Sequence, residues 1–186
     1  MKTNFVLASI FAALALTISA AAQDKVTNFS GTWTLDVSKS KLGDRNMIES
    51  QTLTVAQTDK DIKIETATKR TPPPADAPQG EGRGRGRMGG MMGGDMPVTY
   101  TLDGKETKTE MSGPMGSMPV SLKAKWDGGK LKLSRSSSFS GPMGDVTITS
   151  NETWDLSGDG KTLTVNVERS TPRGNESATK VFTKKS

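Results

Sequence analysis

The stretch VTITSNETWDLSGDGKTLTVNVERS (residues 146–170) contains two runs of alternating apolar and polar residues joined by a short turn. A period of two is typical of a strand with one buried face. The dipeptide Asp159-Gly160 lies between the runs, and glycine can take the positive φ that a tight hairpin needs. The stretch therefore predicts an antiparallel hairpin. Its apolar phase consists of Val146, Ile148, Trp154, Leu156, Leu163, Val165 and Val167.

The same alternation extends from Gly31 to the end of the chain, without a comparable helical period. Turns of the same type recur in DGG (127–129) and in YTLDGKETK (100–108), and each predicts a further hairpin. The expected class is all-β: an up-and-down antiparallel meander closed into a barrel of 8–10 strands, since closure removes exposed edges. A two-sheet β-sandwich is the alternative architecture. Ten strands are expected near 31–37, 49–57, 61–69, 97–102, 105–111, 119–126, 130–139, 146–156, 161–170 and 176–184.

The N-terminus has the pattern of a secretory signal peptide over residues 1–22. Lys2 precedes an apolar run, small residues follow at Ala20 and Ala22, and cleavage is expected before Gln23. The apolar run is too short for a permanent membrane span. We therefore expect a secreted or periplasmic protein that forms a single domain over residues 23–186. The chain has no cysteine, which excludes a disulfide-linked partner.

The composition argues against an enzyme. The chain has neither histidine nor cysteine, so the usual nucleophile–base pairs and the common zinc and haem sites cannot be built. The segment GRGRMG (84–89) matches a dinucleotide fingerprint in letters only, because no helix is expected after it. The formal net charge of +5 is mild, and the Arg-Gly run lacks interleaved aromatic residues. We expect no cofactor and no nucleic-acid partner.

The segment NFSGTWTLD (28–36) resembles the first strand of lipocalin-like (calycin) barrels, in which a Gly-x-Trp motif begins the barrel. Gly31 and Trp33 are the matching positions. The wider pattern, from SGTW to the run after ETWDL, also resembles uncharacterised secreted bacterial β-proteins. The resemblance implies a cup for a small apolar ligand and a late arginine that stacks across the tryptophan, for which Arg169 is the candidate.

Several polar residues fall in the apolar phase of the expected strands. The inward phases reach Arg135 and Arg169, and between Ile148 and Trp154 they include Glu152. An interior charge must be paired, hydrated or used. One interpretation is that an arginine binds the anionic end of an amphipathic ligand. The other is that these residues close an end of the barrel, with Arg169 packed on Trp33 or paired with Glu152.

Tryptophans complete the candidate binding site and allow the same two interpretations. They line a ligand cavity, or they are ordinary core anchors, since an indole buries a large area. The expected function is non-catalytic binding of a small apolar or amphipathic ligand, and the alternative is a structural or interaction protein of the envelope that acts through surface loops. The candidate ligand-binding residues are Trp33, Trp126, Arg135, Glu152, Trp154 and Arg169.

Residues 70–97 form an insertion rich in proline, glycine, arginine and methionine, which we expect to be disordered. It can be a linker or a flexible lid. Its methionines suggest a third function, because closely spaced thioethers can hold Cu(I) in an oxidising compartment. The candidate copper ligands are Met88, Met91, Met92 and Met96.

Overall fold

The structure is a computed structural model that describes residues 27–43, 47–71, 95–113, 116–141, 144–172 and 174–185. It contains ten strands and one short 3-10 helix. The elements are β1 (Gly31–Leu35), η1 (Val37–Lys39), β2 (Ile48–Gln57), β3 (Asp61–Arg70), β4 (Val98–Thr101), β5 (Glu106–Gly113), β6 (Gly116–Asp127), β7 (Lys130–Gly141), β8 (Gly144–Leu156), β9 (Thr162–Thr171) and β10 (Gly174–Lys184). All ten expected strands are present.

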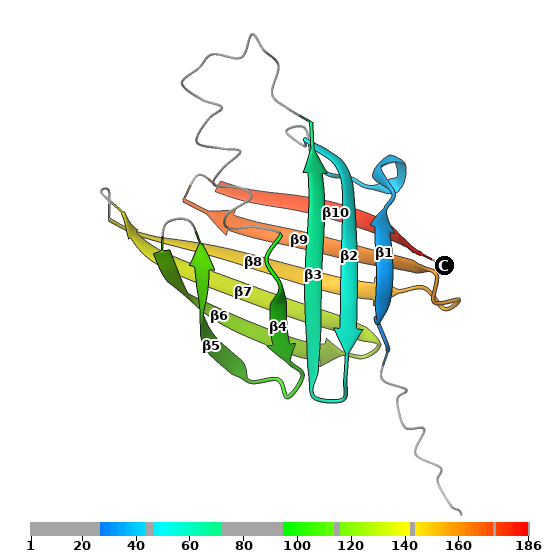
Figure 1. Ribbon diagram of the computed structural model, residues 1–186, viewed down its shortest axis with the longest axis horizontal. Coiled ribbons are helices and arrows are strands. Elements are labelled where there is room, and N and C mark those ends of the chain that lie inside the picture. Colours follow the sequence, from blue (N-terminus) through cyan, green and yellow to red (C-terminus); the bar gives the residue numbers. More distant parts are fainter. Residues whose placement is uncertain are drawn as a thin grey trace, which may run out of the picture.

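The strands form one antiparallel sheet with the order β4-β3-β2-β1-β10-β9-β8-β7-β6-β5. Strands that follow one another in the chain are therefore neighbours in the sheet, with the exception of β4 and β5, which are its two edges. In addition, the first strand, β1, pairs with the last, β10. The sheet curls into a nearly closed barrel (Figure 1). This confirms the all-β meander and the lipocalin-like barrel at the level of the fold, in place of the two-sheet sandwich.

The barrel has a seam at the turn that joins β4 and β5. These strands are the two edges of the sheet, so the hairpin expected over residues 100–108 is wrong. The turn itself is present, since Gly104 has a φ of 78°. However, the amide of Leu102 donates to the carbonyl of Lys60 at 2.8 Å, which holds the end of β4 beside β3. Across the seam, the hydroxyls of Thr101 and Thr107 lie 3.1 Å apart.

The first strand ends two residues before the expected position. Asp36 caps η1, because its Oδ1 accepts hydrogen bonds from the amide of Lys39 at 3.2 Å and from the hydroxyl of Ser38 at 2.6 Å. These bonds, led by that of Ser38, lower the pKa of Asp36 to about 2. As a result Val37 lies in η1 and is 41% exposed, rather than continuing the inward phase of the strand.

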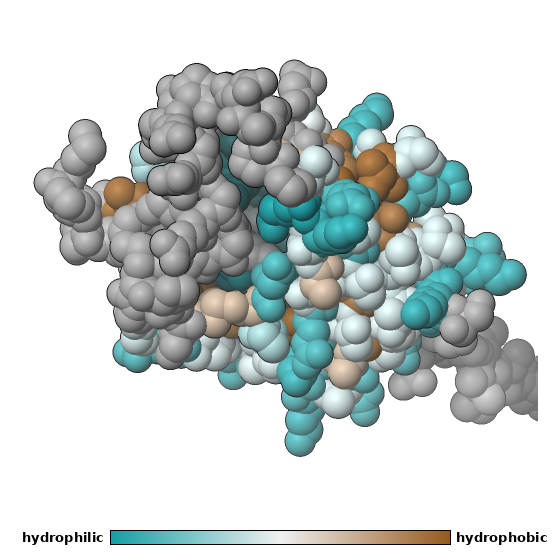
Figure 2. Space-filling model, turned by 45° about the horizontal axis from the view of Figure 1, so that its top comes forward, coloured by the Kyte–Doolittle hydropathy of each residue, from teal (hydrophilic) through white to brown (hydrophobic). Residues whose placement is uncertain are grey.

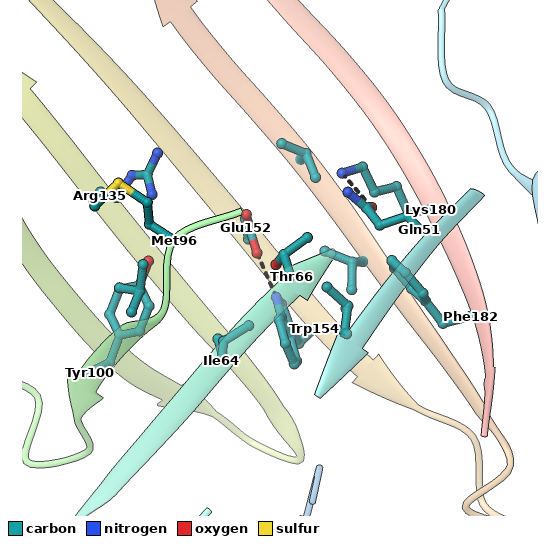
Figure 3. A pocket seen from close by; sticks show the side chains of 14 residues that line it. Gln51, Ile64, Thr66, Met96, Tyr100, Arg135, Glu152, Trp154, Lys180 and Phe182 are labelled. Atoms are coloured by element: carbon teal, nitrogen blue, oxygen red, sulfur yellow. Dashed lines mark hydrogen bonds between the residues drawn. The ribbon is translucent and has the colours of Figure 1, made fainter. Parts of the chain in front are cut away.

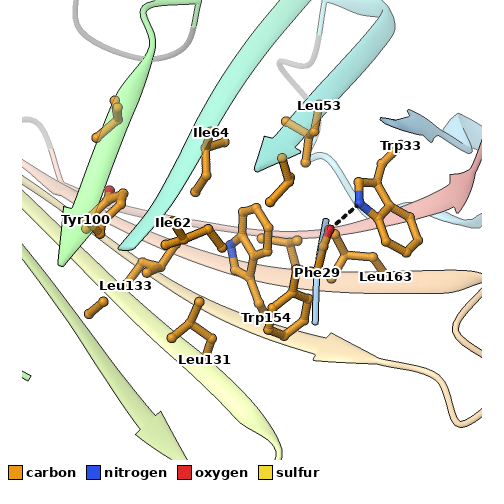
Figure 4. Packing of buried hydrophobic residues seen from close by; sticks show 14 of the residues in the cluster. Phe29, Trp33, Leu53, Ile62, Ile64, Tyr100, Leu131, Leu133, Trp154 and Leu163 are labelled. Atoms are coloured by element: carbon orange, nitrogen blue, oxygen red, sulfur yellow. Dashed lines mark hydrogen bonds between the residues drawn. The ribbon is translucent and has the colours of Figure 1, made fainter. Parts of the chain in front are cut away.

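An aromatic base fills one end of the barrel; we use this name for Phe29, Trp33, Trp126 and Trp154. Phe29 stacks on Trp126 at a centroid distance of 6.0 Å and meets Trp154 edge-on at 5.7 Å. The buried indole of Trp33 donates to the carbonyl of Phe29 at 2.9 Å (Figure 4). Leucine, isoleucine and valine side chains continue the core from there. Phe29, Trp33 and Trp154 are almost completely buried at this end of the barrel, and Trp126 is partly buried against them.

The exterior is predominantly polar. On the face shown in Figure 2, hydrophobic side chains occupy only small areas of the described surface. Within the described residues, no helix is long and apolar enough to cross a bilayer. The expected signal peptide (1–22) lies outside the described residues, as does the expected insertion apart from its ends at residues 70–71 and 95–97.

Candidate functional site

A cavity lies inside the barrel beyond the aromatic base, and we call it the barrel cavity. About 80 Å³ of it is open to the centres of water molecules, within about 590 Å³ of atom-free space that includes solvent at its opening. This is room for several waters. The lining residues are Gln51, Leu53, Ile64, Thr66, Met96, Val98, Tyr100, Arg135, Glu152, Trp154, Val165, Val167, Lys180 and Phe182 (Figure 3).

Neighbouring strands bring three of the candidate residues to this cavity. Trp154 lies two residues after Glu152 on β8, so both side chains point to the same face. The indole of Trp154 donates to Oε2 of Glu152 at 2.8 Å, and the indole ring separates the cavity from Phe29 of the base. Arg135 comes from β7, where it is paired with Ser150 of β8. The inward-phase prediction therefore places Arg135, Glu152 and Trp154 at one cavity.

A lysine and a glutamine form a second polar group on the wall. Nζ of Lys180 on β10 donates to Oε1 of Gln51 on β2 at 3.1 Å. Gln51 is only 5% exposed, and its Nε2 donates in turn to the hydroxyl of Thr68 at 2.8 Å. Burial lowers the pKa of Lys180, because the ammonium has lost much of its water; Glu152 opposes this shift. In the view of Figure 3, Lys180 and Gln51 lie opposite Arg135 and Tyr100.

Tyr100 completes the polar lining. It lies on β4 and is only 6% exposed. Burial raises the pKa of its phenol strongly, the negative charge of Glu152 raises it further, and the positive charge of Arg135 lowers it. The hydroxyl is therefore a neutral hydrogen-bonding group at physiological pH. Among the described residues, no buried side-chain nitrogen or oxygen lacks a hydrogen-bond partner.

Three candidate residues do not line the cavity. Trp33 and Trp126 belong to the aromatic base. Arg169 lies on the inward phase of β9, where its register partners are Ser150 and Glu176. It is thus two strands away from Arg135, or about 10 Å across the sheet.

The cation over Trp33 is Lys184, whose Nζ lies 5.2 Å from the ring centroid, and not Arg169. Trp33 is paired with Lys184, whereas Arg169 is paired with Glu176. Eight residues of β10 separate these two positions, about 26 Å along a strand. Stacking of Arg169 on Trp33 is therefore excluded. The expected pairing with Glu152 is also not among the ion pairs of the described chain, where Glu152 accepts the bond from Trp154 instead.

Of the four candidate copper ligands, only Met96 lies within the described residues. It is partly buried and lines the barrel cavity. Met88, Met91 and Met92 lie outside the described residues, so the copper site stays a prediction. In the described part of the chain, no three histidine, cysteine, aspartate or glutamate side chains are grouped in a way that could hold a metal ion.

Sequence reasoning missed Gln51, Lys180, Thr66 and Tyr100 as lining residues. The signal for Gln51 was present, because extending the phase of Leu53 back by two residues reaches it. For Lys180 the signal was weak. Only Phe182 identifies the inward face of β10, since valine at position 181 points the other way.

Comparison with known proteins adds one structural likeness. No protein-family model matches the chain, and no curated protein matches its sequence. Among solved structures, the zebrafish ileal bile acid-binding protein complexed with cholic acid matches with a TM-score of 0.46 and 15% sequence identity. The match covers 84% of this chain and 98% of the zebrafish chain.

Proposed function

We propose that this protein is an exported, non-catalytic binding protein that holds a small amphipathic molecule in the barrel cavity. One observation carries the proposal: Arg135, Lys180 and Glu152 line one cavity whose other lining residues are mostly apolar. Interior charges cost free energy, and a closed barrel of this size can be filled with apolar side chains instead. Charged side chains in a largely apolar cavity are what a binding site for a ligand with one polar end requires.

The charges indicate the polarity of the ligand. The lining carries two basic side chains and one acidic side chain, and the acidic one already accepts a hydrogen bond from Trp154. An anionic group on the ligand is therefore favoured near Arg135, whose planar guanidinium can bind two oxygens. The hydrocarbon part would contact Trp154, Val165 and Phe182. The modest volume favours a small ligand, since drug-sized molecules occupy pockets of roughly 300–1,000 Å³.

Export is supported by the sequence alone. Lys2, the apolar run that follows it and the small residues at Ala20 and Ala22 have the pattern of a secretion signal. The non-catalytic role is supported by the lack of histidine and cysteine. Native mass spectrometry of the protein purified from its own host tests export and ligand binding, because it reports the mass of the processed chain and of any bound molecule.

A matched pair of arginine variants tests the anchor. Binding of the small amphipathic anion hexanoate is measured by isothermal titration calorimetry for wild type, Arg135→Gln and Arg169→Gln. We expect Arg135→Gln to weaken binding about tenfold or more, because a charge-assisted hydrogen bond is worth about 1.5–3 kcal/mol. Arg169→Gln is the control, since it loses the same charge outside the cavity. Equal weakening by both variants, with normal melting curves, would contradict the proposal, and an envelope protein acting through surface loops would then be favoured.

A further inference from the structure

Lys180 is held in the barrel cavity in a way that differs from the other described lysines. It is the one lysine among the residues that line the cavity. Its amine is positioned by Gln51, which is itself fixed by Thr68. An amine that is already fixed inside a cavity loses little further conformational entropy when it reacts with a carbon atom bound there.

The surroundings also favour the uncharged form of this amine. Loss of water around Lys180 lowers its pKa, and the positive charge of Arg70 lowers it further. Glu152 and Asp95 act in the opposite direction, so the groups that face Lys180 do not all have the same effect. Only the free amine has the lone pair that attacks a carbonyl carbon, and a desolvated lysine is a recognised way to obtain it.

We propose that Lys180 captures small apolar aldehydes in the barrel cavity as a reversible Schiff base. This inference rests on the proposed function, because the aldehyde must first enter the cavity. The apolar wall of Trp154, Val165 and Phe182 accepts the hydrocarbon, and the limited volume favours an aldehyde over a bulkier ketone.

The reaction balances with groups that line the cavity. The nitrogen of Lys180 attacks the aldehyde carbon, and the carbonyl electron pair moves to oxygen to give a carbinolamine after proton transfer. The hydroxyl then leaves as water, and a carbon–nitrogen double bond forms. Glu152 is the lining carboxylate whose charge acts on Lys180, and in this proposal it carries the proton from nitrogen to the leaving hydroxyl. The imine nitrogen then takes up the proton that the ammonium of Lys180 released before the attack, and Glu152 serves as counter-ion to the protonated imine.

Reductive trapping tests the proposal. The purified protein is mixed with less than one equivalent of hexanal and cyanoborohydride near neutral pH, and the alkylated lysine is located by peptide mass spectrometry. We expect the hexyl group on Lys180. At this ratio of aldehyde to protein, we expect the total labelling of Lys180→Arg to be at least ten-fold lower than that of wild type. The control Lys184→Arg alters an exposed lysine of the same strand, and we expect its labelling to equal that of wild type. If the label on wild type is instead spread over exposed lysines, the inference is overturned. This outcome is read from wild type alone, so it does not depend on whether a variant folds.

Non-covalent ligands separate the two proposals. Hexanoate and hexanol cannot form an imine, and their binding is measured by isothermal titration calorimetry. If they bind while hexanal leaves Lys180 unlabelled, the binding function stands and Schiff-base capture is refuted. If they do not bind and Lys180 is unlabelled, both fail. Slower trapping in Glu152→Gln than in wild type, with each protein saturated with hexanal, would support the role of Glu152 in proton transfer, and equal rates would remove that role.

Discussion

The alkaline titration of Tyr100 measures how dry the wall of the barrel cavity is. An ordinary phenol ionises near pH 10. Tyr100 is only 6% exposed, and burial raises its pKa well above that value. We therefore expect the hydroxyl to stay protonated in the folded protein at about pH 11. The chain contains a single tyrosine, so the ultraviolet absorbance of phenolate reports this position alone.

The same shift makes the free energy of unfolding depend on pH. Because the pKa of Tyr100 is raised on folding, its contribution is complete below pH 10 and is lost as the pH rises above it. Each pH unit in that window costs about 1.4 kcal/mol. At about pH 11 the protein should thus have lost about 1.4 kcal/mol through this group, or about 3–6 °C in Tm for a domain of this size.

The variant Tyr100→Phe isolates the effect. It removes the titrating hydroxyl and keeps the ring, so other alkaline changes remain in both proteins. Urea unfolding followed by tryptophan fluorescence at pH 9 and pH 11 should show wild type losing about 1.4 kcal/mol more than the variant. Equal losses, or full phenolate absorbance from folded wild type at pH 11, would mean that water reaches the hydroxyl and that the cavity wall is not dry.

Three further predictions concern the packing and the charges. Burial lowers the pKa of Lys180, so wild type should gain stability as the pH rises from the lowered pKa toward the ordinary lysine value near 10.5, and Lys180→Met should flatten this slope in urea unfolding at several pH values. Gly31 has a φ of 135°, and an added Cβ would lie 2.7 Å from Cε of Lys184. Gly31→Ala should cost about 1–3 kcal/mol from backbone strain. Lys184→Ala in the same background should recover little of that cost, and full recovery would assign it to the clash instead. Leu131 is fully buried, so Leu131→Ala should cost about 2–5 kcal/mol in the same assay, and a smaller loss would indicate a core that collapses around the gap.

The strands were predictable because their signals are local. Alternation and Asp-Gly turns lie within about ten residues of each other, and all ten strands were found from them. The pairing of the strands was less accessible, since it depends on distant residues. The turn at Gly104 looks like the turns at Gly128 and Gly160 in sequence, yet it joins two strands that do not pair. What distinguishes the turn at Gly104 from the other two is the backbone hydrogen bond from the amide of Leu102 to the carbonyl of Lys60. No local sequence pattern contains that contact.

Only part of the candidate site could be predicted from the sequence, for a similar reason. Arg135 and Glu152 were found because their strands carry strong apolar phases that can be extended. Lys180 was not, because β10 carries large apolar side chains on both faces and gives no clear phase. Its role depends on Gln51, which is 129 residues away in the chain and reaches it only when β1 pairs with β10. The pairing of the first strand with the last is therefore what creates this part of the site.

The two halves of the interior differ in what they contribute. Phe29 and Trp33 close the base with apolar surface and a satisfied indole, which stabilises the fold directly. Arg135, Glu152 and Lys180 instead place charge in the barrel cavity, where apolar residues of similar volume are often equally stable or more stable. If the cluster serves binding, Lys180→Met should keep or raise Tm while it abolishes aldehyde capture. A variant that loses stability and keeps capture would show that the cluster is structural.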